Sequence, residues 1–410
     1  KNLIIENKLN EKVYISHPIS KLNNKYNKIV LLLIDSLSKD KLNKYMKKNK
    51  KSVFNKILKN SIWLEKFYSI SEWTLPIIIS LFYGLKPNKH STTQEYDTKN
   101  INYNKKTSMF KFFKDNNYST FGYGPLTKYN LAYGTSNYFD KFDYGGGFTN
   151  IHRAESKIND FLKIKSNSFL YCHIYDTYFP LYSVNKHDLQ NFKFDNLHFN
   201  NNIEYNNLIS KKRDSNLEIE ISKKNKKILD EKFEIRLKEI DQNLSKILNK
   251  IDNKTTLIIS ADHGNYYDNS KKTILGENGL NIPLIIYNKK FKKKIKKKNF
   301  FNTLDLRKVL IKLITFINEI KIINFLKKLK KDEIISESIW KDKYKASYRN
   351  NNYSYHYTCE YDEKNKKIKF NNKINDFLFK SNFKNEDIEL DKIKNLNLIN
   401  KFKKKIINFI

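Results

Sequence analysis

The stretch Lys28-Ile-Val-Leu-Leu-Leu-Ile34, followed directly by Asp35, is the clearest structural signal in this sequence of 410 residues. A continuous apolar run of this length is typical of a β-strand buried on both faces, as in a parallel sheet covered by helices. Similar runs occur further along the chain, and two of them also end in an aspartate. They are Ser168–Tyr175 before Asp176, Thr256–Ala261 before Asp262, and Pro283–Tyr287.

Helical patterns alternate with these apolar runs. In residues 233–251, Leu237, Ile240 and Leu244 recur at spacings of three and four, which places them on one face of a helix. Similar patterns predict helices over residues 109–117, 155–163 and 302–330. This alternation predicts an α/β fold with three layers (α/β/α) around a mainly parallel central sheet.

The chain divides into three parts by composition. Residues 1–27 form a polar N-terminal segment, residues 28–334 carry the strand and helix patterns, and residues 335–410 differ from both. Within the central part, residues 183–232 are a polar insertion rich in Asn and Lys, for which the sequence predicts no particular structure.

Residues 335–410 predict a small C-terminal α+β subdomain. Residues 353–360 and 366–371 alternate like strands, and residues 391–410 have the pattern of a closing helix. Just before this part, residues 289–299 form a basic run. The run has two interpretations, a solvated loop or a platform for an anionic substrate.

The charge of the chain is strongly positive. There are 79 Lys and Arg against 43 Asp and Glu, which gives +36, and such a balance first suggests nucleic acid or a membrane surface. However, only 5 of the basic residues are Arg, and the chain has only 4 Ala. This composition is typical of an AT-rich genome, and Arg is the residue that base recognition favours. We therefore expect no nucleic-acid partner.

The triplet Asp262-His263-Gly264 after a buried strand is typical of a metal site. A carboxylate and an imidazole would ligate from adjacent positions, and Gly264 allows the chain to turn sharply. Asp35 can add a third ligand, because ligands in open α/β sheets bind beyond the carboxyl ends of the strands. The alternative is that each aspartate only begins a turn. Three such aspartates in one chain favour a site.

Thr74 lies two residues before Pro76, in the segment Ser71-Glu-Trp-Thr-Leu-Pro-Ile-Ile-Ile-Ser80, where we expect a helix to begin. A hydroxyl there lies in the positive end of the helix dipole, and coordination to a metal would make it a nucleophile. The alternative is that Thr74 only caps the helix.

Taken together, these segments resemble the sulfatase family of the alkaline phosphatase superfamily, whose members are metal-dependent phospho- and sulfo-hydrolases and transferases. The resemblance covers about residues 28–320 in order, and residues 335–410 look like the C-terminal subdomain of the family. It rests on Ile29–Asp35, on the pattern Thr74-Leu-Pro-x-x-x-Ser-Leu-Phe-x-Gly84-Leu-x-Pro87-x-x-His90, on Phe169–Asp176 followed by Pro180 and Tyr182, and on Ser260-Ala-Asp-His-Gly264.

The resemblance implies roles for particular residues. Asp35, Thr74, Asp262 and His263 correspond to ligands of one divalent metal ion, and Thr74 falls at the position of the nucleophile. Five further positions become candidates for contacting the substrate. These are Lys271 and Lys272, where the family often has a lysine that contacts the ester oxyanion, Asp176 and Tyr178 in the segment that usually bears a substrate-contacting His, and His90.

The chain also departs from the family pattern. Sulfatases oxidise a Cys or Ser to formylglycine, an aldehyde that Thr cannot give because its β-carbon carries a methyl group. In related phosphodiesterases and lipid-headgroup phosphotransferases, Thr is the nucleophile. Ile78 stands where the family has an arginine, Tyr178 where it has a histidine, and Ser36 where it has a second aspartate.

No convincing second set of ligands occurs, so we expect one metal ion. Mn²⁺, Zn²⁺, Ca²⁺ and Mg²⁺ all remain candidates, and an oxygen-rich set with one imidazole suits Mn²⁺ or Zn²⁺ best. We interpret His173, which lies within a strand run, as a packed residue rather than a ligand.

Two functional hypotheses follow. The first is a metal-dependent hydrolase or transferase that acts through Thr74 on a phosphate ester, or less favourably a sulfate ester, of an anionic small molecule, glycan or lipid headgroup. The second is a degenerate family member that binds an anionic glycan or lipid headgroup without catalysis, which the loss of the Arg and His positions suggests.

The sequence contains no targeting signal that identifies the cellular compartment of the protein. The longest strongly apolar runs, residues 29–34 and 76–81, are far shorter than the about 18 residues that a membrane-spanning helix needs. No signal-peptide pattern is visible in the chain, which begins at Lys1. Bacterial cytoplasm and periplasm both remain open.

Overall fold

Strand β1 (Lys28–Ile34) lies inside the larger of two sheets, and all seven of its side chains are buried. The computed structural model describes residues 26–92, 108–129, 135–136, 138–147, 149–178, 223–265, 275–292, 294–315, 318–380 and 388–410. In it β1 pairs in parallel with β5 (Ser168–Ile174) on one side and with β6 (Thr255–Ser260) on the other. The predicted strands over residues 28–34, 168–175 and 256–261 are therefore present and adjacent.

The larger sheet has eight strands in the order β4-β3-β5-β1-β6-β7-β2-β8. Its neighbouring strands run parallel except at β7, which is antiparallel to both β6 and β2. The predicted mainly parallel sheet is thus confirmed. The remaining strands are β2 (Ser61–Tyr68), β3 (Ser119–Gly124), β4 (Lys141–Tyr144), β7 (Leu284–Tyr287) and β8 (Ile295–Asn302).

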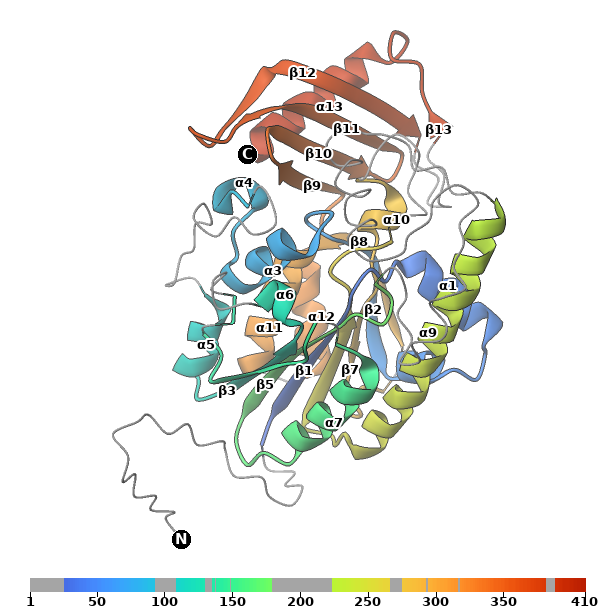
Figure 1. Ribbon diagram of the computed structural model, residues 1–410, viewed down its shortest axis with the longest axis vertical. Coiled ribbons are helices and arrows are strands. Elements are labelled where there is room, and N and C mark those ends of the chain that lie inside the picture. The colour runs from blue at the N-terminus through green and yellow to red at the C-terminus, as the bar shows by residue number, and fades with distance from the viewer. Residues whose placement is uncertain are drawn as a thin grey trace.

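Helices cover both faces of this sheet and give the predicted three layers (Figure 1). On one face α9 packs against α1, α2 and α7, and on the other α11 packs against α3, α5 and α12. The helices are α1 (Lys39–Lys48), α2 (Val53–Lys59), α3 (Thr74–Tyr83), α4 (Pro87–His90), α5 (Met109–Asp115), α6 (Leu126–Tyr129), α7 (Ile151–Leu162), α9 (Lys223–Lys250), α10 (Glu277–Leu280), α11 (Thr303–Thr315) and α12 (Glu319–Lys328).

The C-terminal part forms a second, antiparallel sheet with its own hydrophobic core. Its five strands run in the order β13-β12-β11-β10-β9, and α13 (Leu396–Phe409) covers one face, where Phe402 stacks on Tyr348 with ring centroids 4.6 Å apart. This sheet lies beyond the end of the larger one, near α3, α4 and α10 (Figure 1). Its strands are β9 (Glu333–Trp340), β10 (Lys343–Asn350), β11 (Tyr353–Asp362), β12 (Lys367–Lys380) and β13 (Ile388–Glu389).

Several elements differ from the expectation at their ends. The predicted helix over residues 302–330 is two helices, α11 and α12, and α9 begins at Lys223, inside the predicted insertion. Residues 183–222 of that insertion lie outside the described residues. None of the described helices is both long and apolar enough to cross a membrane.

The basic run continues directly into a strand. β8 pairs in parallel with β2 at the edge of the larger sheet, exposes Lys296 and Lys298, and buries Phe300 and Phe301. Exposed lysines on an edge strand discourage pairing with another chain. The position of this run at the sheet edge supplies a structural reason for its charge.

Candidate metal centre

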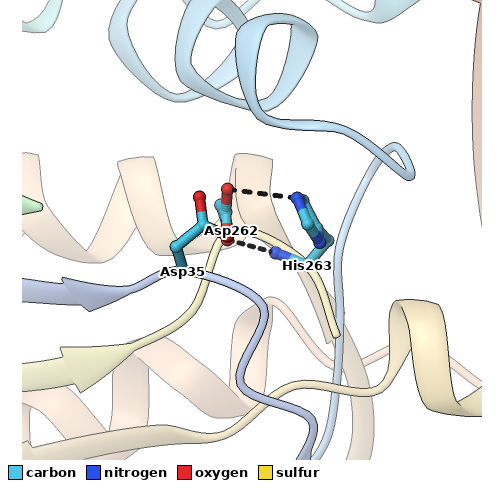
Figure 2. A group of neighbouring side chains, drawn as sticks. All are labelled: Asp35, Asp262 and His263. Carbon is cyan, nitrogen blue, oxygen red and sulfur yellow. Dashed lines mark hydrogen bonds and ion pairs between the residues drawn. The ribbon is translucent and has the colours of Figure 1, made fainter. Parts of the chain in front are cut away.

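The carboxyl ends of β1 and β6 bring three candidate ligands together. The register pairs Leu33 with Ser260, so Asp35 and Asp262 follow their strands at the same level. Together with His263 they form a buried group in which one ligand atom from each residue lies within 4.8 Å of the others. Figure 2 shows the two carboxylates and the imidazole of this group side by side.

Ser36 holds both carboxylates in place. Its hydroxyl donates to Asp35 Oδ1 at 2.6 Å, and its backbone N–H donates to Asp262 Oδ1 at 3.2 Å. It does so from a left-handed backbone conformation with φ of 61°, which a non-glycine residue adopts only at a cost. A strained serine thus stands where the resemblance implies an aspartate, and it orients the two carboxylates rather than adding a third.

The turn at Asp262-His263-Gly264 aims the imidazole at the carboxylates. His263 Nδ1 lies 2.8 Å from the carbonyl oxygen of Gly264, an acceptor, so Nδ1 carries the proton and the lone pair of Nε2 faces Asp262 Oδ2 at 3.4 Å. Gly264 donates its N–H to Gly279 at 2.7 Å. A Cβ at Gly264 would lie 1.8 Å from the carbonyl oxygen of Asn278, so only glycine fits this approach.

Thr74 is the first residue of α3 and faces the same group. Its Oγ1 lies 2.8 Å from Asp262 Oδ2 and 3.4 Å from both Asp35 Oδ2 and His263 Nε2. The N-cap of α3 is Trp73, and no side chain caps this helix. The interpretation of Thr74 as an N-cap is therefore wrong, because its hydroxyl points to the carboxylates instead of to the helix backbone.

The loop that carries Thr74 is fixed by the second sheet. The carbonyl of Ile70 accepts from the N–H of Glu337 at 2.8 Å, and the carbonyl of Ser69 accepts from the hydroxyl of Ser336 at 2.6 Å. The rings of Trp73 and Trp340 meet edge to face, 5.2 Å apart. Strand β9 therefore positions the start of α3 through two hydrogen bonds and one aromatic contact.

The electrostatics of the group favour a cation. Burial raises the pKa of Asp262, and the nearby charge of Asp35 raises it further. Burial also opposes ionisation of Asp35, but the neighbouring His173 and His263 bring the pKa of Asp35 below its usual value. Two adjacent carboxylates away from water repel each other, and a divalent cation would remove that repulsion.

The other predicted site residues are more scattered. His90 is fully buried behind α3, between the hydroxyls of Ser80 and Thr92 at 3.3 and 2.8 Å, and burial lowers its pKa to about 3. Asp176 accepts the N–H of Ile151 at 2.9 Å, at the start of α7. The structure thus gives both residues partners away from the carboxylates.

Tyr178 is connected to the group through two other aromatic rings. It is half-buried after β5, its ring centroid is 5.1 Å from that of Tyr175, and Tyr175 in turn is 5.0 Å from His173. Lys271 and Lys272 lie outside the described residues.

Two residues at the group were not among the predicted site residues. Ser36 acts through its backbone conformation, which no pattern in the sequence reveals. His173 Nε2 lies 3.5 Å from Asp35 Oδ2 and 3.9 Å from Asp262 Oδ2. The alternation of side chains along β5, combined with its pairing to β1, is the signal that could have found it.

The comparison with protein families decides the affiliation. The family model for sulfatases matches residues 27–315. The chain belongs to the sulfatase family. A search among curated proteins found no match.

Several solved structures share the fold at low sequence identity. A 2-O GAG sulfatase aligns with a TM-score of 0.66 at 12% identity, over 94% of this chain and 92% of the other. A phosphonate monoester hydrolase from Silicibacter pomeroyi gives 0.63 at 11%, over 93% and 95%. Ps i-CgsB, solved with k-i-k-neocarrahexaose, gives 0.58 at 15%, over 94% and 93%.

The close approach at Gly264 leads to a first prediction. In Gly264→Ala the added Cβ meets the Asn278 carbonyl, so the turn that carries His263 must shift. We expect the free energy of unfolding to fall by about 2 kcal/mol, as for other overpacked sites, and metal affinity to fall with it. Urea unfolding measures the first effect. Gly147→Ala is the matched control, because nothing lies within 4 Å of a Cβ there. Equal stability of the two variants would contradict the prediction.

The burial of Asp176 leads to a second prediction. Burial raises its pKa to about 7, against about 3.9 in an unfolded chain. The folded protein therefore keeps a proton that the unfolded chain loses, and the free energy of unfolding falls as the pH rises from about 4 to about 7.

Asp176→Asn should remove this contribution, which amounts to at most about 1.4 kcal/mol per pH unit, because an amide does not titrate in this range. The amide oxygen can still accept from the N–H of Ile151, so the hydrogen bond at the start of α7 is kept. Urea unfolding across that pH range measures the slope, with the exposed Asp115→Asn as control. A slope unchanged in Asp176→Asn would refute the prediction.

Proposed function

We propose that the protein is a metal-dependent enzyme that cleaves phosphate esters with Thr74 as its nucleophile. One observation supports this most strongly. Thr74 is the first residue of the buried helix α3, and its hydroxyl lies 2.8 Å from Asp262 Oδ2 and 3.4 Å from Asp35 Oδ2 and His263 Nε2. A threonine hydroxyl held against two carboxylates and an imidazole has the surroundings of an activated nucleophile.

The residues present fit a divalent cation. Asp35 and Asp262 are both fully buried, and in the described part of the chain their ion-pair partners are histidines rather than Lys or Arg. We propose that Asp35, Thr74, Asp262 and His263 hold the ion. Three oxygens and one nitrogen suit Mn²⁺ or Zn²⁺ better than Ca²⁺ or Mg²⁺. A bound cation would lower the pKa of the Thr74 hydroxyl and neutralise charge on the ester oxygens.

The identity of the nucleophile favours phosphate over sulfate. Formylglycine is an aldehyde, and the β-carbon of Thr74 carries a methyl group that prevents its formation. Among the structural neighbours, a phosphonate monoester hydrolase shows that the fold also serves phosphorus chemistry. We therefore propose a phosphate ester, and a sulfate ester only by a route that does not need the aldehyde.

The proposed reaction is a double displacement. Thr74 Oγ1 attacks phosphorus, so the Oγ1–P bond forms while the bond from phosphorus to the leaving oxygen breaks. The Thr74 proton leaves through the hydrogen bond to Asp262 Oδ2, and the leaving oxygen takes a proton from solvent. Water or an acceptor hydroxyl then attacks phosphorus and breaks the Oγ1–P bond. Its own proton passes to solvent, and the proton held at Asp262 returns to Oγ1 and restores Thr74. The acceptor decides between hydrolase and transferase, and both fit this sequence of steps.

The substrate class is inferred from the neighbours and from the charge of the chain. One neighbour is named as a GAG sulfatase and another is solved with k-i-k-neocarrahexaose, so we propose an anionic glycan ester, with a small-molecule or lipid-headgroup ester as the alternatives. Lys271 or Lys272 would neutralise the charge of the transferred group, and we propose that Tyr178 contacts it.

A non-catalytic binder is the second candidate. Ile78 occupies the position of the expected arginine, and its side chain is fully buried within α3. Tyr178 occupies that of the expected histidine. A family member without these two charged groups, and with an intact carboxylate pair, could bind an anionic ligand without turning it over.

A screen of model esters tests the enzyme. We expect turnover of a nitrophenyl phosphodiester or phosphomonoester in the presence of Mn²⁺ or Zn²⁺, and its loss on chelation. Thr74→Ala should lower turnover at least about a thousand-fold, as removal of a nucleophile does. Thr74→Ser, which keeps a hydroxyl, should retain part of the rate.

The exposed Thr315→Ala at the end of α11 is the matched control. An unchanged rate in Thr74→Ala would sink the proposed nucleophile. Hydrolysis of nitrophenyl sulfate alone would contradict phosphate specificity, and absence of all turnover in a correctly folded, metal-loaded protein would favour the binder.

A further inference from the structure

His173 is a fully buried histidine of β5 whose Nε2 has no hydrogen-bond partner. The register pairs it with Leu33, two residues before Asp35, so its side chain leaves the sheet on the same face as that of Asp35. Nε2 faces Asp35 Oδ2 at 3.5 Å and Asp262 Oδ2 at 3.9 Å. A polar atom this deeply buried is ordinarily paired, and this one points at the two carboxylates.

The other ring nitrogen is held by a chain of tyrosines. Nδ1 lies 2.7 Å from the hydroxyl of Tyr129, which ends α6, and that hydroxyl also hydrogen-bonds the hydroxyl of Tyr171. When Tyr129 donates to Tyr171, its oxygen accepts from Nδ1–H, and the lone pair of Nε2 is then directed at the carboxylates. Metal-binding histidines usually donate their second N–H in this way. The backbone carbonyl of Gly264 does the same for His263.

We propose that His173 is a further ligand of the cation held by Asp35, Thr74, Asp262 and His263, with Tyr129 as the residue that fixes its tautomer. This inference rests on the proposed function, since it assumes that a cation binds there. The separations from the two carboxylates agree with it, whereas the group of atoms within 4.8 Å of one another comprises Asp35, Asp262 and His263 without His173, so the two imidazoles must approach each other when the ion binds. Ligand atoms about 2.1 Å from one ion lie between roughly 3 and 4.2 Å apart, and both distances from Nε2 fall in that interval.

The additional imidazole changes the chemistry of the site. Two nitrogens and three oxygens form a more nitrogen-rich set than the four residues alone. Such a set favours Zn²⁺ or Mn²⁺ and works against Ca²⁺ and Mg²⁺, which prefer oxygen. The opposing view is that His173 only orients Asp35, in which case the cation has a single imidazole ligand.

Counting imidazole ligands separates these views. The full chain is loaded with one equivalent of Cu²⁺ as a spectroscopic probe, and pulsed electron paramagnetic resonance counts the coupled imidazoles. We expect two in the unmodified protein, one in His173→Gln and one in His263→Gln. The exposed His152→Gln should keep two, and so should Tyr129→Phe, because its histidine is intact.

Zn²⁺ affinity, measured by calorimetry, gives a second readout. Loss of a residue that only supports a ligand costs about 10–100-fold in metal affinity, and we expect that range for Tyr129→Phe. His173→Gln should lose more than that. Circular dichroism and thermal melts of each variant show whether it folds, and the count in the unmodified protein needs no variant at all.

A single imidazole in the unmodified protein, lost in His263→Gln and kept in His173→Gln, would overturn the inference and leave the proposed function intact. Absence of stoichiometric Cu²⁺ and Zn²⁺ binding would instead overturn the proposed function itself, and the inference with it.

Discussion

Two carboxylates buried side by side, Asp35 and Asp262, set the constraint on which the rest of the site depends. Charges removed from water cost free energy unless they are compensated, and like charges at close range add to that cost. Hydrogen-bond donors of the surrounding residues offset part of this cost. The hydroxyl and N–H of Ser36, the hydroxyl of Thr74 and the N–H of His263 all point at carboxylate oxygens. These donors are neutral, and a divalent cation would supply the missing positive charge.

The second sheet takes part in this arrangement although none of its described residues is among the candidate ligands. Thr74 can face the carboxylates only if the loop before α3 is held, and β9 holds it through the carbonyls of Ser69 and Ile70 and through Trp340. From the other side, the N–H of Ser69 donates to the carbonyl of Leu280 at 2.8 Å. The position of Thr74 is therefore defined by parts of the chain more than 200 residues apart, and the C-terminal sheet has a structural role at the site.

The features that could be predicted from sequence are those that depend on local pattern. Long apolar runs mark β1, β5 and β6, and the aspartates after β1 and β6 meet because parallel strands end at one edge. Features that depend on pairing or on backbone angles could not be predicted. The lysines of β8 mask the apolar pattern that marks the other strands. The antiparallel direction of β7 is visible only from its pairing with β6 and β2, and the role of Ser36 depends on a positive φ. The sequence alone favours packing for His173, because its proximity to Asp35 becomes visible only with the register of β1 and β5.

The central claim is that one cation binds where Asp35, Thr74, Asp262 and His263 converge, and anomalous diffraction tests it most directly. Crystals of the full chain grown with Mn²⁺ or Zn²⁺ and measured at the absorption edge of that metal should show one strong peak in contact with both carboxylates, the Thr74 hydroxyl and His263 Nε2. A peak elsewhere, or no peak in metal-saturated crystals, with the Thr74 hydroxyl still hydrogen-bonded to Asp262, would contradict the account.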